Sequence, residues 1–132
     1  SDYGGAGVAV ATITNMTDNI TEPFMASSII SAPQWLKATL AAPSYVTSVT
    51  IGASTSTGGW GSNYLNGCIL QISDDDVLWR DVAIMSGYVT AGVSYNANSL
   101  KTWPVNLNCS YLRLISTQAS SLYVTCGEFI VI

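Results

Sequence analysis

The sequence predicts an all-β domain, a β-sandwich of the jelly-roll type with about eight antiparallel strands. Short stretches alternate apolar with polar or small residues at a period of two, and turn-forming residues separate these stretches. No stretch carries a sustained apolar stripe at helical spacing with caps at its ends. Hydrophobic residues make up 48% of the chain and charged residues only 9%, which disfavours disorder because disordered chains are poor in apolar residues and rich in charge.

The expected strands can be placed along the chain in order. A Gly-rich segment at residues 1–7 is expected to be flexible, and the first strand follows at residues 8–14. Further strands are expected at residues 35–40, 46–52, 68–73, 78–84, 100–107, 111–117 and 122–132. With 132 residues, the chain is long enough for one hydrophobic core and too short for two, so residues 8–132 are expected to form a single domain.

The connections between these strands differ in length. If successive strands run up and down, the long connections fall at one end of the sandwich, at residues 53–67, 85–98 and 118–121, together with residues 24–33. The opposite end has only short turns, at residues 41–45, 74–77 and 108–110. Long irregular loops at one end of a rigid sheet are where binding sites usually lie, so we expect the binding site at that end.

Charge and residue types exclude several function classes. The formal net charge is −4 with only four cations, so the basic stripe that binds nucleic acid is missing and anionic lipid is disfavoured. The chain has no His, which disfavours catalytic triads and zinc chemistry. No convincing carboxylate pair for glycoside hydrolysis is seen, and we expect no enzymatic activity. Cys68, Cys109 and Cys126 lack C-x-x-C spacing, which leaves one disulfide plus one buried thiol as the alternative to a metal cluster.

An acidic turn separates two expected strands within residues 70–79. Its adjacent carboxylates, Asp74, Asp75 and Asp76, could hold a cation. The structural interpretation is favoured, because Ser and Asp side chains stabilise tight turns by hydrogen bonding to nearby backbone groups. Trp79 is then expected in the core.

This stretch resembles the S-x-D-x-x-x-W hairpin of the discoidin family, also called coagulation factor 5/8 type C domains, which are close relatives of the family 32 carbohydrate-binding modules. Residues 18–27 resemble the family's D-G-N-x-x-T-x-W-x-S segment, and residues 32–40 resemble its Q-W-L strand. Residues 110–115 and 126–131 are similar to its two closing strands. The resemblance spans residues 8–132. It implies a jelly-roll sandwich, extracellular display, and binding of sugars or, in some members, of phosphatidylserine membranes or protein receptors.

The resemblance also implies a structural calcium ion in many members of the family. Its expected ligands here are Asp18, Asn19, Thr21 and Glu128, which supply the hard oxygen atoms that calcium requires. The alternative is that Asp18 caps a turn and that Glu128 pairs with Arg113 on a neighbouring strand.

The ligand-contacting residues are expected in the convergent loops. Trp60 lies among glycines and has no strand to pack into, and an exposed large aromatic ring can cover the apolar face of a pyranose. Polar and aromatic side chains suited to the hydroxyl groups of a sugar surround it: Asn63, Tyr64, Tyr88, Tyr95 and Asn96. The alternative is that Trp60 folds back over the sandwich edge. Trp35 and Trp103 are expected to pack on the sheets.

Three functions compete. The first is a lectin-like domain that binds glycans or glycoproteins on a secreted, cell-surface or virion-surface protein. Because a single shallow site is weak, this function needs multivalency, and a homo-oligomer or a larger multivalent protein is expected. The second is a non-catalytic structural or protein-docking module, in which Trp60 would lie at an interface between proteins. The third is lipid binding through apolar loop tips, which the acidic balance disfavours.

Overall fold

The computed structural model describes residues 8–10, 24–27, 35–53, 65–89, 99–116, 123–126 and 128–132. Within this part of the chain there is no helix with the length and apolarity to cross a membrane. The described residues contain eight strands, which confirms the all-β prediction. They are β1 (Val8–Val10), β2 (Phe24–Ser27), β3 (Trp35–Gly52), β4 (Ile69–Ser73), β5 (Arg80–Ile84), β6 (Leu100–Ile115), β7 (Tyr123–Cys126) and β8 (Glu128–Val131).

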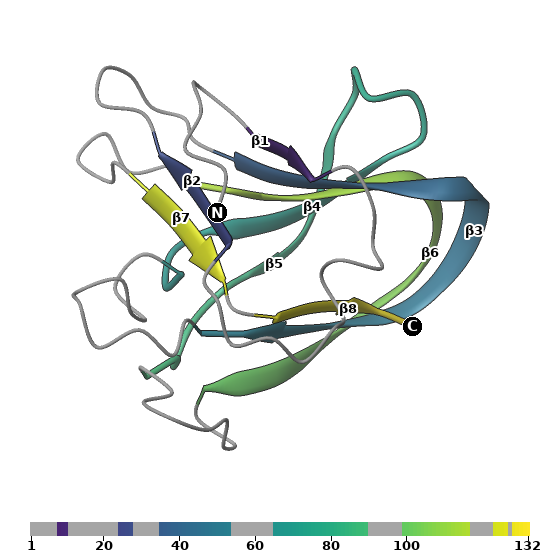
Figure 1. Cartoon of the computed structure of the whole chain (residues 1–132). Coiled ribbons are helices and arrows are strands. Elements are labelled where there is room, and N and C mark those ends of the chain that lie inside the picture. Colours follow the sequence, from purple (N-terminus) through teal and green to yellow (C-terminus); the bar gives the residue numbers. More distant parts are fainter. Residues whose placement is uncertain are drawn as a thin grey trace.

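Two long strands, β3 and β6, form the framework of both layers of the sandwich. They pair antiparallel over most of their length, with an interruption between Thr39 and Ser44, and curve together from one layer to the other (Figure 1). In one half of this pair β1 lies beside β3, β4 lies beside β6, and β5 lies beside β4. In the other half β8 lies beside β3. The strands β3 and β6 were each predicted as two separate strands. The predicted turns at residues 41–45 and 108–110 instead lie within these two strands, at the bend where their pairing is irregular.

Irregular pairing keeps apolar side chains inside on both sides of the bend. Between Val46 and Ser48 the pairing shifts by one residue, because β6 carries an extra residue there, and Asn106 adopts a positive φ of 54°. This is the geometry of a β-bulge, at which Asn tolerates the left-handed conformation. The shift places Val46, Val49 and Ile51 all in the core, whereas strict alternation from Val46 would have turned Ser48 inward.

The segment around Phe24, predicted as a loop leading into Trp35, forms β2. This strand pairs antiparallel with β7, so that Phe24 lies opposite Cys126. The predicted last strand, residues 122–132, is divided into β7, which pairs with β2, and β8, which pairs with β3. The final part of the chain therefore joins two sheets, and β2 lies beside the strand that leads into Glu128.

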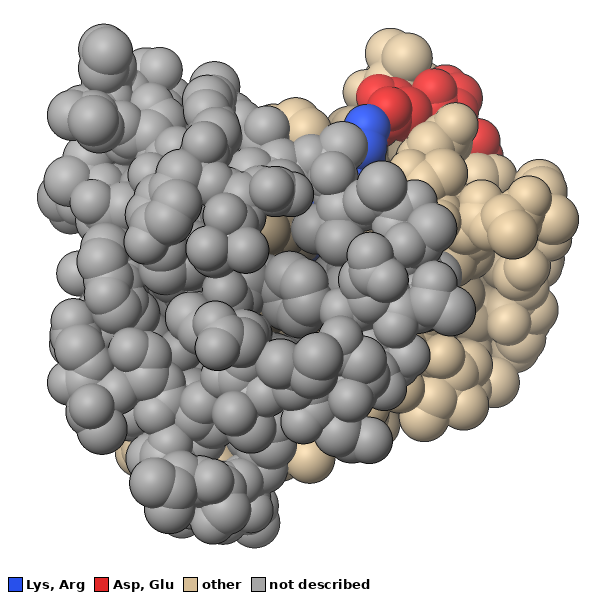
Figure 2. Space-filling model, viewed as in Figure 1, with Lys and Arg blue, Asp and Glu red and all other residues tan. Residues whose placement is uncertain are grey.

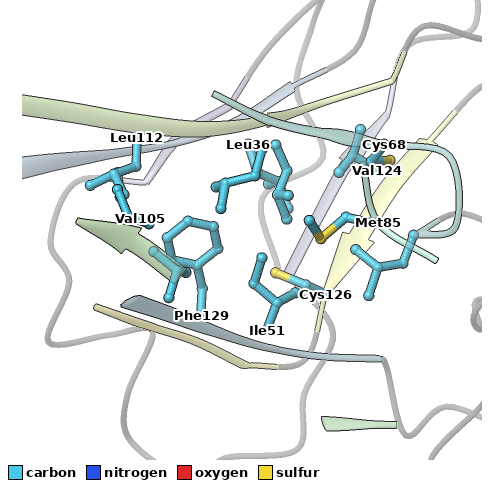
Figure 3. Close-up of a cluster of buried hydrophobic side chains, with 14 of the residues drawn as sticks. Leu36, Ile51, Cys68, Met85, Val105, Leu112, Val124, Cys126 and Phe129 are labelled. Carbon is cyan, nitrogen blue, oxygen red and sulfur yellow. The ribbon is translucent and has the colours of Figure 1, made fainter. Parts of the chain in front are cut away.

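The core lies between the two halves of the bent pair. Leu36 and Leu112 point from one layer toward Ile51 and Phe129 of the other (Figure 3). Phe129 is the largest of the fully buried side chains. The described cysteines are three buried thiols and none forms a disulfide, which is a correction to the expected disulfide. Cys68 and Cys126 belong to the same apolar cluster as Met85, so they serve as small apolar core residues.

Candidate functional site

The two longest connections of the chain begin and end at one place in the fold. The Ala53 N–H donates to the Ser99 carbonyl at 2.6 Å, which ties the start of the first connection to the end of the second. Asn66 and Tyr88 exchange two hydrogen bonds, in which Asn66 Nδ2 donates to the Tyr88 carbonyl at 3.0 Å and the Tyr88 N–H donates to Asn66 Oδ1 at 2.9 Å. The bases of both connections are thus joined to each other in two places.

An aromatic pair links these two tied bases. Trp103 Nε1 donates to the Tyr88 hydroxyl at 2.6 Å, and the two ring centroids lie 6.3 Å apart. Trp103 extends from β6 and Tyr88 from the segment after β5, so the bond joins β6 to the start of the second connection. Lys101 joins them, with Nζ 5.8 Å from the centroid of the Tyr88 ring. Together Asn66, Tyr88, Lys101 and Trp103 form the platform beneath the loop end of the sandwich.

Tyr88 was predicted in the loops as a ligand-contacting residue. The structure buries it to 2% exposure, because its ring packs in the core and Trp103 occupies its hydroxyl. Burial raises the pKa of Tyr88 to about 12, although the hydrogen bond from Trp103 acts to lower it. Tyr88 is therefore a supporting residue of the platform. Trp103 packs against the core cluster, as expected from the sequence.

Most of the other predicted site residues lie outside the described residues. They include the predicted sugar-contacting residues Trp60, Asn63, Tyr64, Tyr95 and Asn96 and the predicted calcium ligands Asp18, Asn19 and Thr21. Glu128 begins β8 opposite Gly52. These assignments stay predictions. The sequence reasoning overlooked Lys101 because the four cations look scattered along the chain, and only strand pairing brings Lys101 to Tyr88.

The buried acids near the platform predict a loss of stability at alkaline pH. Burial raises the pKa of Cys68 and of Tyr88 to about 12 each, while the unfolded chain ionises these groups near pH 8.5 and 10. The folded protein therefore holds more protons than the unfolded chain in this range, so its stability is complete below about pH 8 and falls as the pH rises toward 12. We expect a loss of about 2–3 kcal/mol between pH 8 and pH 10.5, measured by urea unfolding.

A Cys68→Ala variant is the control for this titration. It starts less stable because it removes buried side-chain atoms, but its stability should fall less steeply between pH 8 and pH 10.5. A wild-type stability that stays constant over this range would show that these groups titrate alike in the folded and unfolded states.

The acidic turn lies at the far end of β4 and β5 from the platform. Acidic side chains gather there with a cation beside them (Figure 2). Ser73 Oγ accepts the N–H of Asp76 at 3.0 Å, and Asp75 Oδ1 accepts the N–H groups of Val77 and Leu78, each at 2.9 Å. The Leu78 and Val77 N–H groups lower the pKa of the Asp75 carboxyl. The Ser and Asp of the S-x-D motif thus build the turn, as the structural interpretation predicted.

The remaining carboxylates of this turn have cationic partners. Asp76 pairs with Lys37 at 2.5 Å, and Asp74 pairs with Arg80 at 3.3 Å. Lys37 also lies 5.3 Å from the Trp35 ring and 5.7 Å from the Tyr111 ring. Ion pairs and backbone hydrogen bonds therefore already occupy these three aspartates, so they serve the turn.

Trp79 differs from its prediction as a core residue. It is half-buried on the outer side of the sheet, where the Arg113 guanidinium stacks 3.9 Å from its ring centroid. Arg113 Nε also donates to Gln71 Oε1 at 2.7 Å. Arg113 lies opposite Lys37 and Glu128 opposite Gly52, in different halves of β3, so these two residues do not lie on neighbouring strands.

The geometry defines a class of domain. The described residues form a β-sandwich built on two long bent strands, with an S-x-D-x-x-x-W hairpin at one side and two long connections whose bases are tied together. A scan against protein-family models and a search of curated proteins found no match to this chain.

Solved structures of that fold do match. A fucose-binding module of Streptococcus pneumoniae superposes with a TM-score of 0.63 at 13% identity, covering 93% of this chain and 89% of its own. A family 32 carbohydrate-binding module from Clostridium perfringens NanJ, in complex with galactose, gives a TM-score of 0.59 at 16% identity over 99% and 88%. The lectin domain of lectinolysin, complexed with Lewis B antigen, gives 0.62 at 12% identity over 92% and 84%. At these identities the matches confirm the predicted fold.

Proposed function

We propose that this domain binds glycans, without catalysis, through the two long connections whose bases meet at the platform. The observation that carries the proposal is the tied loop end of a fold shared with carbohydrate-binding modules and lectin domains. Two long connections whose bases are hydrogen-bonded to each other can present side chains in a fixed arrangement. Such preorganisation reduces the entropy lost on binding.

The side chains proposed to contact the sugar are those of the two connections. Trp60 would cover the apolar face of a pyranose, and Asn63, Tyr64, Tyr95 and Asn96 would bind its hydroxyl groups. A single open site of this kind binds weakly, with a free energy of about −4 kcal/mol for millimolar affinity. We therefore propose that the domain acts in several copies, as a homo-oligomer or within a larger protein displayed outside the cell or on a virion.

A glycan array tests this function. The domain is displayed multivalently on a streptavidin scaffold and compared with the monovalent domain on the same array. We expect a defined set of glycans to retain the multivalent form, with a gain of roughly 10²- to 10⁴-fold over the monovalent form. If the multivalent form binds no glycan, the carbohydrate function is excluded and the protein-docking function becomes the one to test.

A structural calcium ion is a second part of the proposal. Phe24 lies opposite Cys126 in the β2–β7 pair, and Glu128 follows Cys126 by two residues. Thr21 precedes Phe24 by three residues, which span at most about 11 Å. The chain therefore allows Asp18, Asn19 and Thr21 to come near Glu128, and carboxylate, carbonyl and hydroxyl oxygens suit calcium.

Calcium is then expected to stabilise the fold. A calcium concentration a hundredfold above the dissociation constant should raise the melting temperature by roughly 5–10 °C, and a chelator should reverse the shift. Glu128→Gln should lose this response, while Asp81→Asn, which changes a carboxylate of β5, should keep it. Equal melting temperatures with calcium and with chelator would exclude the ion.

A further inference from the structure

Three of the four cationic side chains of the sequence have partners on the side of the sandwich that carries the acidic turn. Lys37 pairs with Asp76, Arg80 pairs with Asp74, and Arg113 stacks on Trp79. The remaining cation, Lys101, lies in the platform beneath the loop end. Because the whole chain has four cations, Lys101 is the one positive side chain available to a ligand at the loop end.

Lys101 lies on the core-facing side of its strand. It pairs across the sheet with Ile51, which is fully buried, and directly opposed residues of antiparallel strands share a face. Lys101 is itself half-buried. Trp103, two positions further along β6, lies on the same face and packs against the core. The ammonium therefore lies between β6 and the Tyr88 ring, near the tied bases of the two long connections.

Lys101 forms no ion pair with a carboxylate of the described residues. The ion pairs among the described residues are Lys37–Asp76 and Arg80–Asp74. Gly87 lies directly beside the ammonium, because a Cβ at this position would be 3.4 Å from Lys101 Nζ, and its φ of +70° also disfavours a side chain there. Gly87 thus lets its backbone lie close to the ammonium.

The acidic turn does not neutralise this charge. The turn lies at the end of β4 and β5 away from the platform, and its Asp74 and Asp76 side chains are paired with Arg80 and Lys37. Lys101 has no such partner among the described residues, so its charge is left for an anion although the net charge of the chain is −4.

We infer that the glycans bound at the loop end are anionic, and that Lys101 is the residue that selects them through a carboxylate or sulfate group of the sugar. This inference rests on the proposed glycan-binding function and specifies its ligand class. A partly desolvated ammonium gains most from an ionised partner, because charge-assisted hydrogen bonds are about twice as strong as neutral ones. The Tyr88 ring lies 5.8 Å from Lys101 Nζ and keeps the ammonium beside the platform.

A structural role for Lys101 predicts a different outcome. In the described structure β4 pairs only with residues 111–115 of β6, so the first half of β6 has one paired side. An inward-pointing lysine on such a strand also discourages pairing with other chains. In that case Lys101→Gln would increase self-association and leave the preference among glycans unchanged.

The experiment compares matched pairs of neutral and anionic probes. Polygalacturonate is paired with its methyl ester, 3′-sialyllactose with lactose, and 3-sulfogalactose with galactose, so that the pairs separate uronate, sialate and sulfate sources of the charge. Lys101→Gln is expected to weaken binding to the anionic member of the recognised pair by roughly tenfold and to leave its neutral member unchanged. Arg80→Gln removes the same charge at the acidic turn and should bind like the wild type.

The possible results are distinct. Selective loss with Lys101→Gln, partly restored by Lys101→Arg, supports the inference. Binding of neutral glycans only, or equal losses in Lys101→Gln and Arg80→Gln, would overturn it and leave the glycan-binding function standing. An absence of binding to every probe and to the full array would overturn both. Size-exclusion chromatography of each variant shows whether self-association accounts for a change in binding.

Discussion

Trp60→Ala is expected to abolish detectable glycan binding by the monovalent domain. Removal of a large aromatic residue from the centre of a binding site commonly costs 2 kcal/mol or more, which is a loss of about thirtyfold or greater. Starting from millimolar affinity, such a loss puts monovalent binding beyond measurement and leaves only a weak multivalent signal. Titration of the monovalent domain followed by NMR, together with the multivalent array, measures the effect directly.

A matched control for this variant is Tyr45→Ala. Tyr45 is 58% exposed and lies in the bend of β3, away from the platform. Its truncation removes an exposed aromatic ring of similar kind, so glycan binding and stability should both stay close to those of the wild type. Unchanged binding of Trp60→Ala, or an equal loss with Tyr45→Ala, would show that Trp60 does not mark the site.

Phe129→Ala is expected to be the most destabilising single substitution of those considered. Phe129 is fully buried between the two halves of the bent strand pair (Figure 3). Truncation of a buried Phe removes its transfer free energy and leaves a cavity, and this typically costs 3–5 kcal/mol. Since small domains are commonly stable by 5–15 kcal/mol, the variant should unfold at a much lower urea concentration and show reduced thermal stability.

Ile84→Ala is the control for the core substitution. Ile84 is apolar and lies in a strand, but it is 64% exposed, so its truncation should change the free energy of unfolding by no more than about 0.5 kcal/mol. A small effect of Phe129→Ala, comparable with that of Ile84→Ala, would contradict the position of the core between the layers.

The two substitutions test separate properties of one architecture. The core joins the layers and supports the platform, because Tyr88 is part of the core cluster and also accepts the hydrogen bond of Trp103. A core variant that remains folded should therefore lose stability while its binding changes little. A loop variant should do the reverse. This separation distinguishes a binding residue from a structural one.

The sequence by itself determined the features that depend on few neighbouring residues. Period-two alternation predicted an all-β chain because each residue's face in a strand follows from its position. The S-x-D turn could also be predicted, because Ser73 and Asp75 accept the backbone N–H groups of the four residues 75–78. The family resemblance rested on such local segments, and it predicted the fold that the solved structures share.

Only the tertiary structure decided which distant residues meet. Trp79 stacks on Arg113 and Lys101 approaches Tyr88, and both contacts depend on the register of strands that are far apart in the sequence. The same is true of the long bent strands β3 and β6, since a bend with continued pairing and a turn between two strands have the same local composition. Register is set by the whole set of buried side chains and bulges. That collective property made Tyr88 a core residue and placed Lys101 at the loop end.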